Sequence, residues 1–220
     1  MEKLIRIALD GPSGSGKSTI AKKLSQMLNI LYLDTGAMYR ACALGAVKRN
    51  IDCLCEEKVK DYVKDIDLQI KYENGRQVTI LDGVDVSKEI RNNEVSLMAS
   101  NISSLSCVRE KMVEMQREVA RLNDCIMDGR DIGTVVLPNA SHKFFLTASP
   151  EVRAERRFKE LTEKGQTVDF EELLKEINLR DYNDSHRKIA PLKQAEDAHF
   201  IDSSDKSVEE VVDFIISIIK

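Results

Sequence analysis

The sequence predicts an α/β protein built on a parallel five-stranded sheet flanked by helices. Short apolar segments with the length of buried strands alternate with longer segments whose apolar residues recur at helical spacing. One stretch interrupts this alternation with the residue pattern of an antiparallel insert. The chain has 220 residues, 42% of them hydrophobic and 32% charged, which is typical of a globular domain with a sizeable core.

The expected strands of the main sheet are short and apolar, and several of them end in a turn signal. The first precedes Asp10-Gly11-Pro12, and the third precedes Asp128-Gly129. By this pattern the strands cover residues 4–9, 31–33, 125–127, 142–146 and 199–201.

Helices are expected between these strands, and most carry a start signal. Thr35 is a plausible N-cap for a helix through Ala46, and Ser149 precedes a proline at the first helical position. Residues 169–172 and 207–210 have the pattern of capping boxes. A further helix is predicted to face a core with the stripe Val108, Met112, Met115, Val119 and Leu122.

The insert is expected between about Leu68 and Val86. Leu68, Ile70 and Tyr72 alternate with polar residues, and residues 74–75 (Asn-Gly) and 82–83 (Asp-Gly) are hairpin-turn signals. Three antiparallel strands therefore form a small subdomain within one α/β body.

Charge and cysteine content exclude several classes of protein. The 33 basic and 37 acidic side chains give a net charge of −4, which disfavours broad binding to a nucleic-acid backbone. The five cysteines are odd in number and scattered, so reduced thiols are expected. Glu2, Lys3 and Arg6 interrupt any leader-like apolar start, and no apolar run is long enough to cross a membrane. We therefore expect a cytoplasmic protein that binds neither nucleic acid nor membrane.

A phosphate-binding loop follows the first strand. Residues 11–18, Gly-Pro-Ser-Gly-Ser-Gly-Lys-Ser, match G-x-x-x-x-G-K-[ST] and open a predicted helix, which is the context that this motif requires. Backbone N–H groups and the helix N-terminus suit phosphate oxygens, and Lys17 can reach the β and γ phosphates. The Ser18 hydroxyl suits Mg²⁺, which prefers oxygen ligands. The sequence thus predicts a P-loop nucleotide-binding fold.

A second polar cluster lies at the end of the third strand, in residues 128–131, Asp-Gly-Arg-Asp. Asp128 can assist Mg²⁺ or its waters, while Arg130 and Asp131 can address a ligand. Many arginines also fall near strand ends or on the helices that follow, where α/β sheets bind ligands. Arg180, Asp184 and Arg187 are expected on one face of the helix that begins after Asp169.

The role of Arg153 and Arg157 is open at this level. They lie four residues apart on a charged helix and can be surface residues paired with nearby glutamates. Alternatively they belong to a mobile lid, because phosphoryl transfer requires cations around the transferred group.

Taken together, these motifs resemble those of bacterial cytidylate kinases. The resemblance is carried by the phosphate loop with Thr19, by residues 33–40 (Leu-Asp-Thr-Gly-Ala-Met-Tyr-Arg), by residues 128–136, by residues 180–187 and by Ala190-Pro191-Leu192. It extends over essentially the whole chain, including the insert.

The resemblance implies transfer of the ATP γ-phosphoryl group to CMP or dCMP, with Mg²⁺ as cofactor. It implies that the ATP site comprises Gly11, Pro12, Ser13, Gly14, Ser15, Gly16, Lys17, Ser18, Thr19 and Arg156. Cytosine contacts are expected from Ser100, Arg109 and Asp131, and sugar contacts from Tyr39, Arg180 and Asp184. The acceptor phosphate is expected near Arg40, Arg130 and Arg187, with Thr35 where some relatives carry serine. The expected catalytic set is Lys17, Asp128, Arg130, Arg153 and Arg157, with Ser18 as the metal ligand.

The resemblance also implies one nucleoside monophosphate kinase domain over residues 1–220, which we expect to be a monomer. The core is expected at about 1–58, 104–150 and 189–220, the monophosphate-binding insert at about 59–103, and the lid at about 151–188. Two alternatives remain. A kinase of a small hydroxyl substrate such as shikimate would need a general base, for which Asp34 is the candidate. A nucleotide-dependent switch would not need so many arginines, and an Asn-Lys-x-Asp segment for guanine is missing from the sequence.

Overall fold

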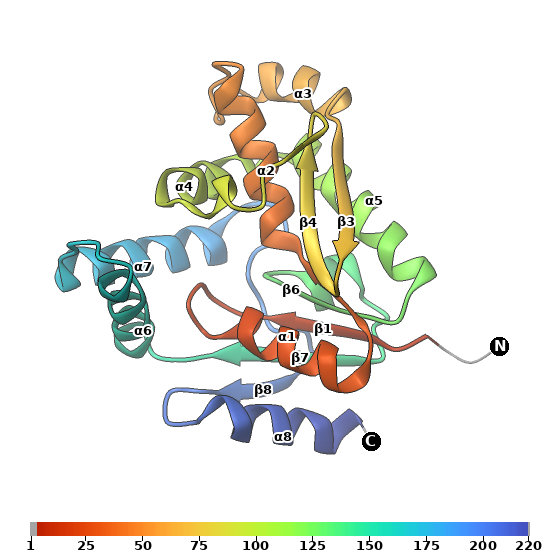
Figure 1. Ribbon diagram of the computed structural model, residues 1–220, viewed down its shortest axis with the longest axis vertical. Helices are drawn as coiled ribbons and strands as arrows, with labels where there is room; N and C mark the ends of the chain where they lie inside the picture. The colour runs from red at the N-terminus through yellow and green to blue at the C-terminus, as the bar shows by residue number, and fades with distance from the viewer. Residues whose placement is uncertain (1–3, 220) are drawn as a thin grey trace. The chain divides into compact units, whose positions relative to one another are not determined.

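The computed structural model describes residues 4–219, so the charged residues Glu2 and Lys3 and the two ends of the expected domain lie outside the described residues. The chain divides into two compact units (Figure 1). The first consists of Met1–Ile30 and Ile126–Lys220, and the second of Leu31–Cys125.

The main sheet has five strands, as the sequence predicts. Their order is β2-β6-β1-β7-β8, in which β1 is Arg6–Asp10, β2 is Leu31–Asp34, β6 is Cys125–Gly129, β7 is His142–Thr147 and β8 is His199–Asp202. The pairs β1–β7 and β7–β8 are parallel. All of β6 is buried, and only the first residue of β1 is not, which explains why both segments read as continuous apolar runs.

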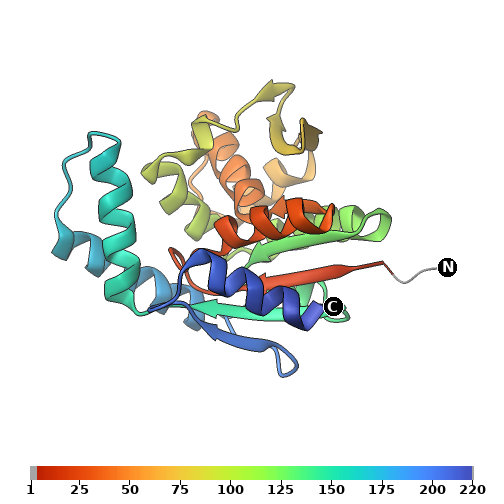
Figure 2. The same ribbon diagram turned by 60° about the horizontal axis from the view of Figure 1, so that its bottom comes forward.

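The helices of the first unit form two groups (Figure 2). Helices α1 (Lys17–Leu28) and α8 (Val208–Ile219) pack against each other beside the strands. Helices α6 (Pro150–Glu163) and α7 (Phe170–His186) form a hairpin that extends away from the strands of this unit. The hairpin has a small apolar core of its own around Ala154, Leu161, Leu173 and Ile177.

The second unit combines helices with the predicted antiparallel insert. Helix α2 (Thr35–Lys48) packs on α4 (Asn93–Ile102), and α3 (Glu56–Lys64) packs on α5 (Ser106–Leu122). The insert consists of β3 (Leu68–Glu73), β4 (Arg76–Leu81) and β5 (Val84–Asp85), in that order and antiparallel. A short 3₁₀ turn, η1 (Glu89–Arg91), follows β5.

The predicted helix caps at Ser149, Asp169 and Ser207 and the two predicted hairpin turns are confirmed. Ser149 and Asp169 accept hydrogen bonds from Val152 and Glu172 at the starts of α6 and α7. At the start of α8, Ser207 exchanges hydrogen bonds with Glu210 as a complete capping box. Both residues of each insert turn, 74–75 and 82–83, have positive φ angles, as type I′ turns require.

Three expectations about helices are wrong. Asp34, not Thr35, caps α2: its carboxylate accepts the Ala37 N–H, and Thr35 is the first helical residue. Leu122 is 71% exposed, because the buried stripe of α5 runs through Val108, Met112, Gln116 and Ala120 instead. Arg187 is not on α7, which ends at His186, and its ψ angle of 141° is extended.

The cysteines and the lengths of the helices agree with the expectations from the sequence. The five cysteines are free thiols, and burial raises the pKa of Cys42 to about 12. Within residues 4–219, no helix combines the length and the apolar character that crossing a membrane requires.

Candidate functional site

The phosphate loop joins the end of β1 to the start of α1, the strand-loop-helix context that the motif requires. Gly11, Gly14 and Gly16 all have positive φ angles, which residues with a Cβ rarely adopt. At Gly11 a Cβ would also overlap the carbonyl oxygen of Leu146 on β7. The glycines are therefore required for the course of the loop.

Lys17 lies inside the loop and is almost fully buried. Its Nζ donates hydrogen bonds to the carbonyl oxygen of Pro12 at 2.6 Å and to Ser15 Oγ at 3.4 Å. Burial, with the nearby charge of Arg130, lowers the pKa of Lys17 to about 7. A buried ammonium group beside a concave loop is suited to a phosphate, whose negative charge would favour the protonated form.

The structure brings Ser18 and Asp128 together, the two residues that the sequence analysis names for Mg²⁺. The Ser18 hydroxyl donates a hydrogen bond of 2.8 Å to Asp128 Oδ2, which joins the start of α1 to the end of β6. A hydroxyl and a carboxylate are the oxygen donors that Mg²⁺ takes when phosphates and water complete its coordination. Among the residues that the structure describes, no group of three or more His, Cys, Asp or Glu side chains could hold a metal by itself.

Asp10 is a site residue that sequence reasoning missed. Its carboxylate is buried at the end of β1 and accepts backbone N–H groups from Ile132 and Gly133, each at 2.7 Å. These donors lie in η2 (Ile132–Val136), a single π-helical turn after Asp131. Burial raises the pKa of Asp10 to about 7 although both hydrogen bonds favour the charged form. The only sequence signal was an acidic residue at a strand end, directly before the loop.

Two predicted arginines of the first unit, Arg130 and Arg187, are each paired with a carboxylate. Arg130 Nε donates to Asp184 Oδ2 at 2.7 Å, and a longer contact of 3.5 Å joins Arg187 Nη2 to Asp131 Oδ1. The charges of Arg130, Arg180 and Arg187 outweigh burial and lower the pKa of Asp184. Asp184 in turn helps to raise the pKa of Arg130 against the effect of burial.

Arg153 is not a surface residue. It is 2% exposed, and its guanidinium donates to the carbonyl oxygens of Ala148 and Ser13 and to both carboxylate oxygens of Asp181. It therefore ties α6 to both α7 and the phosphate loop. Burial decides against the surface interpretation for this residue.

The two neighbouring arginines of α6 differ from it. Arg156 Nη2 donates to the backbone oxygen of Ser203 at 2.6 Å, beside the turn that precedes α8. Arg157 lies 3.7 Å from Glu160, and its side chain is 36% exposed. The Arg157 side chain is therefore partly exposed on the helical hairpin.

In the second unit, Thr35, Tyr39 and Arg40 lie on the first two turns of α2. Arg40 Nη2 donates to both oxygens of Asp34, at 3.3 and 3.2 Å. Burial would raise the pKa of Asp34, but Arg40, Arg91 and the capped N–H of Ala37 together lower it. A carboxylate with this environment is a weak proton acceptor, which argues against Asp34 as a general base.

The remaining predicted residues of the second unit lie on α4 and α5. Arg109 is buried on α5, and its guanidinium carbon is 5.8 Å from the centre of the Tyr39 ring, within the range of a cation–π contact. Ser100 lies near the end of α4, and its carbonyl oxygen accepts the Ser103 hydroxyl at 2.9 Å. The structure thus brings Tyr39 and Arg109 together on facing helices.

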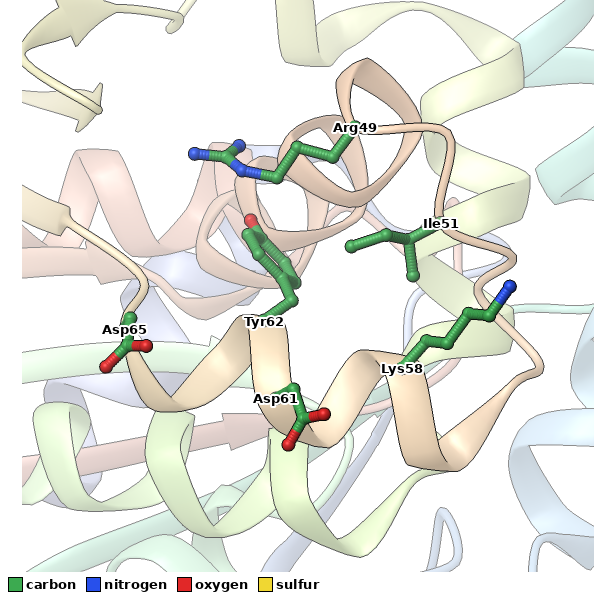
Figure 3. Close-up of a pocket in the computed structure, with 6 residues that line it drawn as sticks. All are labelled: Arg49, Ile51, Lys58, Asp61, Tyr62 and Asp65. Carbon is green, nitrogen blue, oxygen red and sulfur yellow. The ribbon is translucent and has the colours of Figure 1, made fainter.

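A separate cavity of about 430 Å³ lies past the C-terminal end of α2 (Figure 3). It is lined by Arg49, Ile51, Lys58, Asp61, Tyr62 and Asp65. Thr35, Tyr39 and Arg40 are at the opposite end of the same helix, and none of the residues predicted to bind nucleotide lines this cavity. The Arg49 guanidinium stacks over the Tyr62 ring at 5.1 Å and pairs with Asp82, so much of its charge is already balanced.

Solved structures support the fold. A shikimate kinase from Bacteroides thetaiotaomicron superposes with a TM-score of 0.52 at 14% identity and covers 99% of each chain. A protein described as uncharacterized from Eubacterium ventriosum superposes with a TM-score of 0.53 at 15% identity, covering 99% of this chain and 98% of its own. At this level of identity the likeness concerns the fold alone.

Sequence comparisons are more specific. A cytidylate kinase of Caldicellulosiruptor bescii is 51% identical over 98% of this chain and 96% of its own. Cytidylate kinases of Clostridium botulinum and Lactobacillus johnsonii are 49% and 46% identical, over 98% and 99% of this chain and 98% and 94% of their own. The family model described as cytidylate kinase matches residues 7–220. The chain therefore belongs to the cytidylate kinase family.

Proposed function

We propose that this protein transfers the γ-phosphoryl group of ATP to CMP or dCMP, giving ADP and CDP or dCDP. The observation that carries the proposal is that four arginines, all predicted as site residues, are each held by a carboxylate. These pairs are Arg40–Asp34, Arg130–Asp184, Arg153–Asp181 and Arg187–Asp131. A guanidinium group has five N–H donors, so Arg40, Arg130 and Arg187 can keep their carboxylates and still bind phosphate oxygens. The buried Arg153 instead holds the phosphate loop through the Ser13 carbonyl oxygen.

The reaction needs no dedicated base. The phosphate of CMP already presents an anionic oxygen, because its second pKa is about 6. The barrier is then set by alignment and by repulsion between two polyanions, which positioned cations reduce. Lys17 would bind the β and γ phosphates, and Arg40, Arg130 and Arg187 the acceptor phosphate. Arg157 would contact the transferred group when the helical hairpin closes on the nucleotides.

ATP, the proposed phosphoryl donor, would bind as its complex with Mg²⁺. Ser18 and Asp128 would hold the ion through oxygen, directly or through its waters. When bound, Mg²⁺ supplies positive charge to the β and γ phosphates. The hydrogen bond between the two side chains keeps both oxygens together at the end of the loop.

Selectivity for cytosine would come from Ser100, Arg109 and Asp131. A carboxylate accepts a hydrogen bond from the exocyclic amine of cytosine, whereas uracil presents a carbonyl at the same position and is repelled. Tyr39, Arg180 and Asp184 would bind the sugar. Asp131 is paired with Arg187, and Asp184 with Arg130. The carboxylates proposed to bind the base and the sugar therefore also hold two of the arginines proposed to bind the acceptor phosphate.

Neither alternative has comparable support. A kinase of a hydroxyl substrate would rely on Asp34, whose pKa is lowered and whose carboxylate is occupied by two arginines. A switch protein does not need Arg40, Arg130 and Arg187 as a set of cations for a second anion.

We also propose a division of the chain into three parts, an oligomeric state and a cellular compartment. The core comprises about 1–58, 104–150 and 189–220, the insert at about 59–103 binds the monophosphate, and the segment at about 151–188 is the lid. The protein acts as a monomer in the cytoplasm on ATP and CMP or dCMP, without nucleic acid or membrane as a partner.

A coupled assay of ADP release tests the activity. The acceptors are CMP, dCMP, UMP, AMP, GMP and shikimate, each with ATP and Mg²⁺. We expect turnover with CMP or dCMP that exceeds turnover with each of the others. Lys17→Met is the matched control, since it removes the loop cation and should abolish ADP release with every acceptor. Equal ADP release with and without CMP would overturn the proposal.

A further inference from the structure

The carboxylate of Asp34 is shared by two arginines. Arg91, at the end of η1, donates from Nη2 to Asp34 Oδ2 at 2.8 Å, and Arg40 Nη2 lies 3.2 Å from the same oxygen. Asp34 is buried, while the Arg91 side chain is 53% exposed. Arg91 therefore reaches from the surface of the second unit to a buried charge that it shares with Arg40.

The insert also holds the backbone of Asp34. Gln77 on β4 accepts the Asp34 N–H at 2.8 Å, and its own amide donates to the Asp34 carbonyl oxygen at 3.3 Å. The residue that ends β2 and caps α2 is thus fixed by β4 through its backbone and by η1 through its carboxylate. Both contacts come from the insert and the turn that follows it.

A count of charges shows what Arg91 adds. Arg40 and Asp34 alone form a neutral pair, in which the carboxylate competes with any phosphate for the guanidinium group. With Arg91 on the same carboxylate, the group of three carries a net charge of +1. Because Asp34 is buried, its interactions are screened less than those of surface pairs, so this difference should persist at ordinary ionic strength.

We propose that Arg91 is a positioning residue for the acceptor phosphate. By sharing Asp34 with Arg40, it leaves Arg40 a net positive charge for the phosphate while Asp34 keeps the guanidinium group in place. This inference rests on the proposed function, since it takes Arg40 as a ligand of the CMP phosphate.

The test compares CMP with cytidine, which lacks the phosphate, in calorimetric titrations of the full-length protein. Arg91→Met should weaken CMP binding about tenfold, as the loss of one charge interaction in a partly screened site predicts. Cytidine binding should be unchanged. In the ADP-release assay KM for CMP should rise while kcat and KM for ATP stay within about twofold. Arg91→Lys should restore most of the CMP affinity.

Lys48→Met is the matched control. Lys48 on α2 pairs with Glu89 at the start of η1 at 2.7 Å, so this variant also removes an ion pair between η1 and α2 but does not touch Asp34. If Arg91 only fastened η1 to α2, both variants would behave alike. We expect Lys48→Met to bind CMP and cytidine like the unaltered protein.

Each outcome decides the question. Unchanged CMP affinity in Arg91→Met, equal weakening of CMP and cytidine, or the same loss in Lys48→Met overturns the inference and leaves the proposed function intact. If the unaltered protein binds no CMP, the proposed function fails and the inference with it. Circular dichroism shows whether Arg91→Met folds. Arg91→Gln is a second variant that also removes the charge, and it replaces Arg91→Met in the titrations if Arg91→Met does not fold. Failure of both to fold would make Arg91 a structural residue and overturn the inference.

Discussion

Asp10 Oδ2 accepts the backbone N–H of Gly133 at 2.7 Å, and this bond connects the end of β1 to a turn 123 residues later. Its other oxygen accepts the N–H of Ile132, so one buried side chain fixes η2 directly after Asp131. Asp10→Ala leaves two buried N–H groups without acceptors. We expect a loss of about 3 kcal/mol in the free energy of unfolding at pH 5, measured by urea titration. Asp205→Ala, at an exposed position, is the control, and an equal effect of both variants would contradict the prediction.

The same residue should make stability depend on pH. The folded protein raises the pKa of Asp10 from 3.8 to about 7, so the native state holds this proton more tightly than the unfolded chain. Its contribution to stability is therefore full below pH 3.8 and is lost as pH rises through 7. The difference in unfolding free energy between the unaltered protein and Asp10→Ala should fall by about 2 kcal/mol from pH 5 to pH 7. A difference that grows over this interval would refute the assignment.

Arg153 and Arg157 were both predicted to be catalytic, but we expect Arg153 to contribute to stability and Arg157 to contribute to the rate of phosphoryl transfer. Arg153→Met removes the buried partner of Asp181 and of the Ser13 carbonyl, and we expect a loss of about 3 kcal/mol in stability. Arg157 is partly exposed and pairs with Glu160 at 3.7 Å, so Arg157→Met should change stability by less than about 1 kcal/mol. Its kcat should nevertheless fall about 100-fold, since its charge would act on the transferred group. Thermal unfolding and steady-state kinetics of the two variants test both statements. The assignment fails if Arg157→Met keeps full kcat.

Asp128 should set the requirement for magnesium. Asp128→Asn preserves an acceptor for the Ser18 hydroxyl but removes the negative charge that favours a divalent cation. We expect the Mg²⁺ concentration for half-maximal rate to rise about tenfold or more. The ADP-release assay at saturating nucleotides measures it over a range of Mg²⁺ concentrations. Asp202→Asn, which alters an exposed carboxylate at the end of β8, should leave this concentration unchanged.

Where the sequence predicts the structure correctly, the deciding interactions are local. The phosphate loop, the hairpin turns and the start of α8 involve residues at most a few positions apart, so the printed order of residues contains both partners. The cap of α2 shows the limit. Asp34 and Thr35 are adjacent and both are capping residues, so residue type alone does not decide which of the two caps α2. Asp10 was missed for a different reason, because its two donors are more than 120 residues away.

The face of α5 could not be predicted because two polar side chains lie in its buried stripe. Arg109 and Gln116 interrupt the apolar pattern, so counting apolar residues rotates the expected face toward Met115 and Leu122. Arg109, a predicted cytosine contact, lies over the ring of Tyr39, a predicted sugar contact, which gives it a reason to be buried. Sequence patterns identify buried apolar residues and fail where function places a polar group inside.

Gln116 lies in the buried stripe of α5. Its side chain is 1% exposed, and neither its amide nitrogen nor its amide oxygen has a hydrogen-bond partner within residues 4–219. Burying an amide without partners costs free energy, whereas methionine has a similar shape and no such requirement. Gln116→Met should therefore raise the free energy of unfolding by about 1 kcal/mol. Urea titration measures the change, with Glu114→Met on the exposed face of α5 as the control. If Gln116→Met is instead destabilising by more than its control, an internal water must bind the amide, and the polar residue on this face of α5 is stabilising.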